Sequence, residues 1–297
     1  MKSGLAAMIY ATHALARTGA RLQGRTRLVL VPDEETGGDH GSAYLLKRGI
    51  LGQGAVGMLT PEPTSGAVWN ACRGAVSLRL TTRGKPAHIG LQHQGVNAFE
   101  RMLPIARALF AHERAIRRRI TRHRLSPAAA RRSILLVGGR VEAGATSTRC
   151  RGVHAHGGPP HESRRGLRPR APAIARGGGA RTARRRAPGD RDPAGGPSRG
   201  HARGCSLARA LRASVRDITG RAPRFELCPG LLEIRFYAQR SVPALAYGPG
   251  RLEVSHGPDE FVELDEIERC AQVYALTALR VLGSSELPER AHRSTAR

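Results

Sequence analysis

The stretch Val31–Gly38 reads Val-Pro-Asp-Glu-Glu-Thr-Gly-Gly and joins an apolar run to two adjacent carboxylates. The apolar run at 28–31, Leu-Val-Leu-Val, predicts a buried parallel strand. Because successive strand residues face opposite sides, Glu34 and Glu35 cannot do the same job. One can ligate a metal ion while the other accepts a proton from the water that attacks an amide. On its own, however, an acidic pair after a strand is more often part of a solvated loop.

Other segments add donor side chains of the same kind. Glu62 stands in the Pro-flanked turn Thr60–Gly66, and His256 follows a Gly-Pro-Gly segment near the C-terminus. Carboxylates and an imidazole form the ligand set of zinc or cobalt hydrolases. The neighbouring Asp259 and Glu260 are expected to be solvated or to cap a helix.

Taken in order, these residues resemble the co-catalytic zinc exopeptidase and deacylase family. Its members include acetylornithine deacetylase, succinyl-diaminopimelate desuccinylase, aminoacylase and glutamate carboxypeptidase, and the first two form the most similar branch. Further segments that match its pattern are Met1–Met8, Gly84–His88, Gly95–Ala98 and Cys228–Gly230. The resemblance covers residues 1–140 and 205–285.

The resemblance implies a catalytic or metal-binding role for four side chains. Glu34 is similar to the general base of the family. Glu35 and His256 are similar to ligands of one zinc ion, and Glu62 to a ligand of the other. Intact relatives hold two zinc ions per subunit, for which cobalt can substitute. His256 could instead be an ordinary surface histidine.

The resemblance also implies residues that meet the substrate. His88 is similar to the lid histidine that reaches the partner subunit's active site in dimeric relatives and polarises the amide carbonyl. An ordinary surface histidine is the alternative for His88. Gly248, Pro249 and Gly250 resemble the backbone segment that meets the substrate carboxylate.

Two of the family's five protein ligands have no counterpart in the chain. In the family, an Asp that bridges both metals directly precedes the segment that Met1–Met8 matches, and a His ligand lies further upstream. We therefore expect Met1 to be an internal methionine of a longer protein. Three ligands are too few for two zinc ions, so we do not expect this chain to bind two metals tightly. A non-catalytic, truncated homologue is an alternative.

The formal net charge of +26 is unevenly distributed. Residues 149–203 hold 14 Arg against 3 acidic residues, with many Gly, Pro and Ala and no helical or strand period. Such a tract could neutralise phosphates, which makes a basic nucleic-acid-binding protein a second alternative. We do not expect it, because the tract has no aromatic residue on which bases could stack.

A frameshift explains the Arg-rich tract better than nucleic-acid binding does. The adjacent reading frame of 153–163 can encode an alternating strand that ends in Asp-Arg-Arg, as in the family. We therefore predict that 149–204 is out-of-frame translation and disordered, since so polar a tract cannot bury enough surface to offset its ordering entropy. Intact coding sequence in the genomic DNA would exclude this prediction.

The order of elements predicts an α/β fold with a mainly parallel sheet. The resemblance specifies a zinc-exopeptidase-like catalytic domain with an inserted α+β lid and dimerisation domain. The expected boundaries are 1–71 and 205–297 for the catalytic domain, 72–148 for the lid, and 149–204 for the aberrant tract. Helices are predicted at Gly4–Leu15, Ala43–Leu46, Asn97–His112, from Ser206, and at Asp265–Leu282 with Asp265 as N-cap; further strands are predicted at Ala75–Thr82, Ser133–Val137, Leu231–Tyr237 and Ala244–Ala246.

The expected function is zinc-dependent hydrolysis of the amide bond of an N-acyl amino acid or small peptide. The five dispersed cysteines indicate neither a disulfide framework nor a cysteine zinc site. No apolar run approaches the length of a membrane span, so we expect a cytoplasmic protein without a membrane partner. A homodimer through the lid is the expected assembly.

Overall fold

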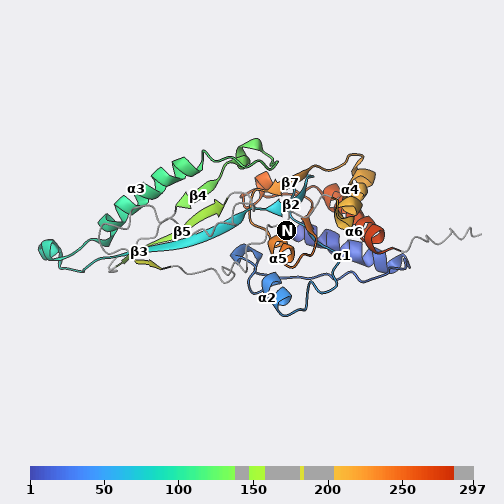
Figure 1. Ribbon diagram of the computed structural model, residues 1–297, viewed down its shortest axis with the longest axis horizontal. Coiled ribbons are helices and arrows are strands. Elements are labelled where there is room, and N and C mark those ends of the chain that lie inside the picture. Colours follow the sequence, from blue (N-terminus) through green and yellow to red (C-terminus); the bar gives the residue numbers. More distant parts are fainter. Residues whose placement is uncertain (138–146, 158–180, 184–203, 284–297) are drawn as a thin grey trace, which may run out of the picture.

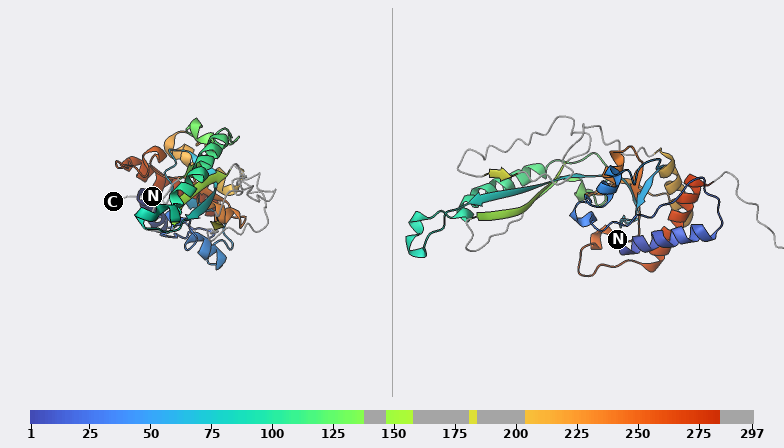
Figure 2. Two further views of the ribbon diagram at one scale, coloured as in Figure 1. Left: turned by 90° about the vertical axis from the view of Figure 1, so that its left-hand side faces the viewer. Right: turned by 90° about the horizontal axis from the view of Figure 1, so that it is seen from below.

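The computed structural model describes residues 1–137, 147–157, 181–183 and 204–283. Its elements form two groups: one around a small mixed sheet, and a second, elongated group that projects from the first (Figures 1 and 2). The elements are α1 (Lys2–Arg17), η1 (Glu34–Thr36), α2 (Ser42–Lys47), β1 (Met58–Thr60), β2 (Val68–Cys72), β3 (Gly74–Arg83), η2 (Ile89–Gln94), α3 (Ala98–Ile116), η3 (Ala128–Arg131), β4 (Ile134–Val137), β5 (Ser147–Gly157), β6 (Arg181–Ala183), α4 (Ser206–Thr219), β7 (Phe225–Cys228), α5 (Ile234–Ala238), β8 (Ala244–Ala246), η5 (Leu252–Val254) and α6 (Leu264–Leu282).

The first sheet has the strand order β1-β8-β2-β7. β1 pairs with β8 and β2 with β7 in parallel, whereas β2 and β8 meet antiparallel at Trp69 and Ala246. The predicted mainly parallel sheet is therefore confirmed, with one antiparallel contact at its centre.

Both faces of the first sheet are covered by helices, because its strand residues alternate between two apolar cores. On β8, Leu245 joins the core that α1, α4 and α6 cover, while Ala244 and Ala246 join the core that α2 and α5 cover. Val68 and Trp69 divide in the same way on β2. The result is a three-layer α/β arrangement.

The second sheet is antiparallel, with the order β4-β5-β3-β6. α3 packs along it through Leu109, which shares a small core with Leu135 and the partly buried Ile105. Asn97 begins the helix by accepting hydrogen bonds from the amides of Phe99 and Glu100, at 2.9 and 3.4 Å.

A buried carboxylate connects the segment after α3 to the first sheet. Glu226 on β7 has a side chain that is only 1% exposed. Its Oε1 accepts a hydrogen bond from Ser126 Oγ at 2.9 Å and lies 3.6 Å from Arg124 Nε and 3.4 Å from Arg224 Nε. The amide of Leu227 also donates to the Arg124 carbonyl at 2.9 Å. The chain therefore returns from α3 against the edge of the first sheet.

Two predicted strands are wrong. Residues 28–31 form no ladder with any described strand, and Leu30 is 59% exposed. Leu231–Tyr237 contains the short helix α5, in which the buried Ile234 and Tyr237 are three residues apart. A spacing of three residues between buried side chains is typical of a helix, whereas a half-buried strand would bury every second residue.

Two further expectations need correction. Asp265 is not the N-cap of α6: Glu263 occupies that position without a side-chain cap, although Asp265 and Glu266 do lie in the first turn, where the helix dipole favours acids. In the tract predicted to be disordered, 149–157 belong to β5 and 181–183 form β6, so β3 has a partner on each edge. The rest of that tract lies outside the described residues.

The other expected helices and strands are present, with ends that differ by a few residues. Among the described residues, no helix is both long enough and apolar enough to cross a bilayer.

Candidate active site

Glu34 and Glu35 lie on a short 3-10 turn, η1, rather than at the end of a strand. The turn closes through hydrogen bonds of 2.9 Å from the Gly37 amide to the Glu34 carbonyl and from the Gly38 amide to the Asp33 carbonyl. Both glycines have left-handed backbones, with φ of 113° and 73°, that other residues rarely adopt. A 3-10 turn rotates successive side chains by about 120°, so the two carboxylates still diverge.

Asp33, the residue directly before this turn, links it to the segment that follows. Its Oδ2 accepts hydrogen bonds from the amides of His40 and Gly41, at 2.7 and 3.0 Å. Oδ1 is buried without a hydrogen-bond partner among the described residues. The segment that carries Glu34 is therefore held by the Asp33 carboxylate, which accepts from two backbone amides seven and eight residues later.

Glu62 follows β1 and is held by two close backbone approaches. A Cβ atom at Gly4 or at Gly248 would collide with the backbone of Pro61. The start of α1 and the end of β8 can therefore press against this turn only because both positions are glycine. Glu62 itself is half-buried.

His256 reaches the first carboxylate segment from the loop after η5. Its backbone is left-handed, with φ of 61°, which is uncommon for a residue with a Cβ atom. Its Nε2 lies 3.7 Å from Glu35 Oε1, and both side chains are 76% exposed. The structure thus brings together two residues that are 221 positions apart in the sequence and that the family resemblance assigns to one zinc ion.

Burial and like charge perturb the carboxylates of this cluster. Burial, reinforced by the charge of Glu34, raises the pKa of Glu62 to about 7. Burial also raises the pKa of Glu34, and the charges of Glu35 and Glu233 add to that effect. Arg235 and His256 oppose it. The four carboxylates therefore share one electrostatic environment, in which an added cation would be favoured.

Sequence reasoning missed Glu233 and Arg235, which come from the region of α5. Glu233 Oε2 accepts a hydrogen bond from Ser42 Oγ at 2.8 Å, and its Oε1 is buried without a partner in the described part of the chain. The only signal was an acid and an Arg two positions apart in Leu231–Tyr237. A strand assignment of that segment suggests no contact between this pair and the segment that carries Glu34.

His88 lies in a different part of the molecule from the carboxylates. It caps η2, and its Nδ1 accepts a hydrogen bond from the Gly90 amide at 3.1 Å. The segment between β3 and α3, which contains η2, forms the far tip of the elongated group in both figures. The structure therefore does not bring His88 to Glu34 within one chain.

The backbone amides of Gly248 and Gly250 already donate hydrogen bonds to other residues of the chain. The Gly248 amide donates to Thr64 Oγ1 at 3.3 Å, and the Gly250 amide donates to Glu266 Oε2 at 2.8 Å. Pro249 has no N–H to offer. A substrate carboxylate could bind Gly250 only in place of the Glu266 carboxylate.

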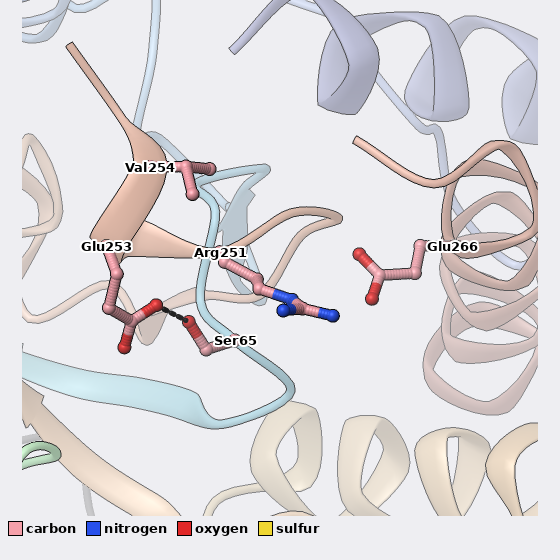
Figure 3. A pocket seen from close by; sticks show the side chains of 5 residues that line it. All are labelled: Ser65, Arg251, Glu253, Val254 and Glu266. Atoms are coloured by element: carbon pink, nitrogen blue, oxygen red, sulfur yellow. Dashed lines mark hydrogen bonds between the residues drawn. The ribbon is translucent and has the colours of Figure 1, made fainter. Parts of the chain in front are cut away.

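A pocket of about 450 Å³ lies beside this segment, on the loop that leads to His256. Figure 3 shows the Arg251 side chain extending across it toward Glu266, while Ser65 donates a hydrogen bond of 3.3 Å to Glu253. The pocket is thus lined by one cation and two carboxylates. Its five lining residues do not include Glu34, Glu35, Glu62 or Glu233, which we call the carboxylate cluster.

Comparison with known protein families identifies the family of this chain. Residues 1–280 match the model of peptidase family M20/M25/M40, which is most of the chain. The chain belongs to this family. Its α/β fold is therefore that of an M20 protein.

Curated relatives match shorter stretches of the M20 chain. A protein of Staphylococcus epidermidis named a probable succinyl-diaminopimelate desuccinylase is 37% identical over 100 residues, which are 34% of this chain and 24% of the relative. A [LysW]-lysine hydrolase of Deinococcus radiodurans is 34% identical over 84 residues, 28% of this chain and 23% of the relative. The matched stretch thus spans about a quarter of each of these relatives.

Solved structures share the fold over nearly the whole chain. A tripeptidase of Staphylococcus aureus has a TM-score of 0.59 at 15% identity, covering 94% of this chain and 70% of its own. A metallo-carboxypeptidase of Sulfolobus solfataricus has a TM-score of 0.56 at 12% identity, covering 94% and 76%. At such identities the likeness concerns the fold alone.

The donor side chains fit a zinc ion in kind but not in number. Two carboxylates and an imidazole are suitable ligands, and the pKa of Glu62 is raised mainly by burial and further by the charge of Glu34. Within the described residues, however, no group of three His, Cys, Asp or Glu side chains is arranged to hold a metal. The Glu35–His256 pair is the part of such a site that the structure displays.

Proposed function

We propose that this M20 chain carries the active-site cluster of a metal-dependent hydrolase that cleaves amide bonds. The observation that carries the proposal is the meeting of Glu34, Glu35, Glu62 and His256, from three distant segments, in one environment of raised carboxylate pKa. The names of the curated relatives, a desuccinylase and a hydrolase, support this reaction class.

Glu34 is the general base in this proposal. Its raised pKa brings its proton affinity nearer to neutral pH, where a base is most effective. It accepts a proton from the attacking water and returns that proton to the leaving amine. Its exposed neighbour Glu35 diverges from it on the 3-10 turn and is free to serve as a ligand.

Glu35 and His256 would be ligands of one metal ion and Glu62 a ligand of the other; we propose that the metal is zinc, with cobalt as a substitute. A bound zinc ion would lower the pKa of water and polarise the amide carbonyl. A solved M20 relative from Bacillus subtilis, with a TM-score of 0.53 at 14% identity, is described as a dinuclear metal-binding peptidase. That description supports metal dependence in this proposal.

The substrates that we propose are N-acyl amino acids or small peptides, whose carboxylate would compete with Glu266 for the Gly250 amide. His88 would act on the substrate of a partner subunit, because it lies far from its own carboxylate cluster. A homodimer through the second sheet and α3 is therefore part of the proposal.

The substitution Glu34→Gln tests the assignment of the base. It keeps the size of the side chain and removes its proton-accepting charge, so we expect kcat to fall by about 10²- to 10⁴-fold. Zinc binding, measured by calorimetry, should remain within about threefold of the parent chain, because the ligands are unchanged. The matched control is Glu260→Gln, in the exposed loop after His256, which should leave kcat unchanged. Undiminished turnover in Glu34→Gln would exclude Glu34 as the base.

A further inference from the structure

The turn that carries Glu34 rests on α5, a helix nearly 200 residues later in the chain. Three contacts join residues 37–42, at and after the turn, to residues 233–236, at the start of α5. Arg235 Nη2 donates a hydrogen bond of 2.5 Å to the Gly37 carbonyl, and Ser42 Oγ donates one of 2.8 Å to Glu233 Oε2. At Gly38, a Cβ atom would lie 2.8 Å from Glu233 Oε1 and 3.0 Å from Phe236 Cε2. The end of the turn therefore packs directly on the helix.

The guanidinium of Arg235 is itself fixed on α5. Its Nη1 donates to the Leu232 carbonyl at 2.7 Å, and its Cζ lies 4.0 Å from the centroid of the Phe236 ring. A planar fork held by the Leu232 carbonyl, just before α5, and by the Phe236 ring presents its second nitrogen in one direction. That direction is the Gly37 carbonyl.

Arg235 does not act by pairing with one carboxylate. Glu34, Glu233 and Asp39 are all close enough for their charges to act on it, yet none lies within 4 Å as an ion pair in the described part of the chain. Its hydrogen bonds to other described residues go to two backbone carbonyls instead. Its contribution is therefore to backbone geometry within a negatively charged environment.

We propose that Arg235 is a positioning residue for Glu34. The peptide unit at Gly37 links the two: its amide donates to the Glu34 carbonyl at 2.9 Å, and its carbonyl accepts from Arg235. Arg235 thereby holds the left-handed end of the 3-10 turn and, through it, the carboxylate at the turn's first position. The kinetic consequence of this role rests on the proposed function, whereas the ordering of the turn does not.

The test compares Arg235→Gln, Arg235→Lys and Arg240→Gln in the full chain. Arg240→Gln removes the same charge from an exposed side chain just beyond α5 and serves as the matched control. The first readout is amide hydrogen exchange by NMR at Gly37 and Gly38, with the amides of α4 and α6 as an internal reference for global stability. We expect exchange at the turn to rise by about tenfold or more in Arg235→Gln, as for the loss of a charged hydrogen bond, with no change in α4 and α6.

The Arg235→Lys variant separates the effect of the planar guanidinium from the effect of the positive charge. Lys can donate to one carbonyl but cannot bridge Leu232 and Gly37 as a planar fork, so we expect it to restore only part of the protection. The second readout is kinetic: kcat should fall by about tenfold or more in Arg235→Gln while KM stays the same, because the base and not the substrate site is displaced.

Three results would overturn the proposal. These are unchanged exchange at Gly37 and Gly38, an equal rise of exchange in α4 and α6, and full kcat in an active Arg235→Gln variant with a loosened turn. A parent chain without any hydrolysis would count against the proposed function alone, and the exchange data would still decide the role of Arg235.

Discussion

Among the carboxylates of the described residues, Glu62 has the most strongly raised pKa. Its backbone lies in a turn against which Gly4 at the start of α1 and Gly248 after β8 pack closely. Burial, with the charge of Glu34, raises its pKa to about 7, so a proton or a metal ion must compensate its charge at neutral pH. The folded metal-free protein therefore binds a proton at pH values at which the unfolded chain has released it.

A pH-dependent stability follows from this shift. Between pH 4.5 and 7 the folded state holds the Glu62 proton more tightly, so its contribution is full below pH 4.5 and is lost as the pH rises to 7. At 1.36 kcal/mol per pKa unit the loss is about 3 kcal/mol. Glu62→Gln removes the titrating group, so its free energy of unfolding relative to the parent should rise from pH 5 to pH 8 in chelator-containing buffer. Urea denaturation at the two pH values measures it, with Glu260→Gln as a control that should show no such change. A difference independent of pH would contradict the assignment.

At the residue scale, the sequence was informative where a motif is local. Glu34, Glu35, Glu62 and His256 were selected from short patterns, and the structure places Glu35 and His256 3.7 Å apart. Glu233 and Arg235 were missed because their meaning depends on contacts with Ser42 and Gly37, about 190 residues away. Contacts between residues so far apart along the chain cannot be recognised from a single sequence.

At the element scale, periodicity identified the long helices better than the short elements. The helices α1, α3 and α6 each bury one face and run for 16 to 19 residues, which makes the helical period clear. Residues 28–31 and Leu231–Tyr237 were misassigned because a short apolar run fits a strand or a helix equally well. For 28–31, no neighbouring described strand satisfies its backbone, which an isolated segment could not reveal.

The outer face of α3 carries a prediction about assembly. Phe99, Leu103 and Phe110 are spaced along one face of the helix and are 45%, 39% and 46% exposed, and they point away from the face that packs on the second sheet. Such a stripe is typical of an interface, and we expect a second copy of the chain to cover it. Sedimentation of the purified protein should show a dimer that Leu103→Lys converts to a monomer. Leu264→Lys, at an 82% exposed position on α6, is the control. A monomeric parent protein, or equal dissociation in the control, would contradict the expectation.

At the scale of the whole molecule, the class of fold followed from the sequence but the arrangement of strands did not. Alternating helices and strands indicated an α/β protein, yet the order β1-β8-β2-β7 joins strands that are nearly 200 residues apart. The linkage through Glu226 was equally invisible, because its partners Ser126 and Arg124 lie about 100 residues earlier. The out-of-frame origin of 149–204 remains a prediction for the genomic DNA.

The central claim is that this molecule hydrolyses amides with the aid of a metal at the carboxylate cluster. The most direct measurement is the rate of hydrolysis of N-succinyl and N-acetyl amino acids by chelator-treated protein as zinc is added. The claim predicts no hydrolysis in chelator and a rate that rises to saturation with zinc. A folded protein that hydrolyses none of these substrates at any zinc concentration, or that hydrolyses them equally well in chelator, would contradict it.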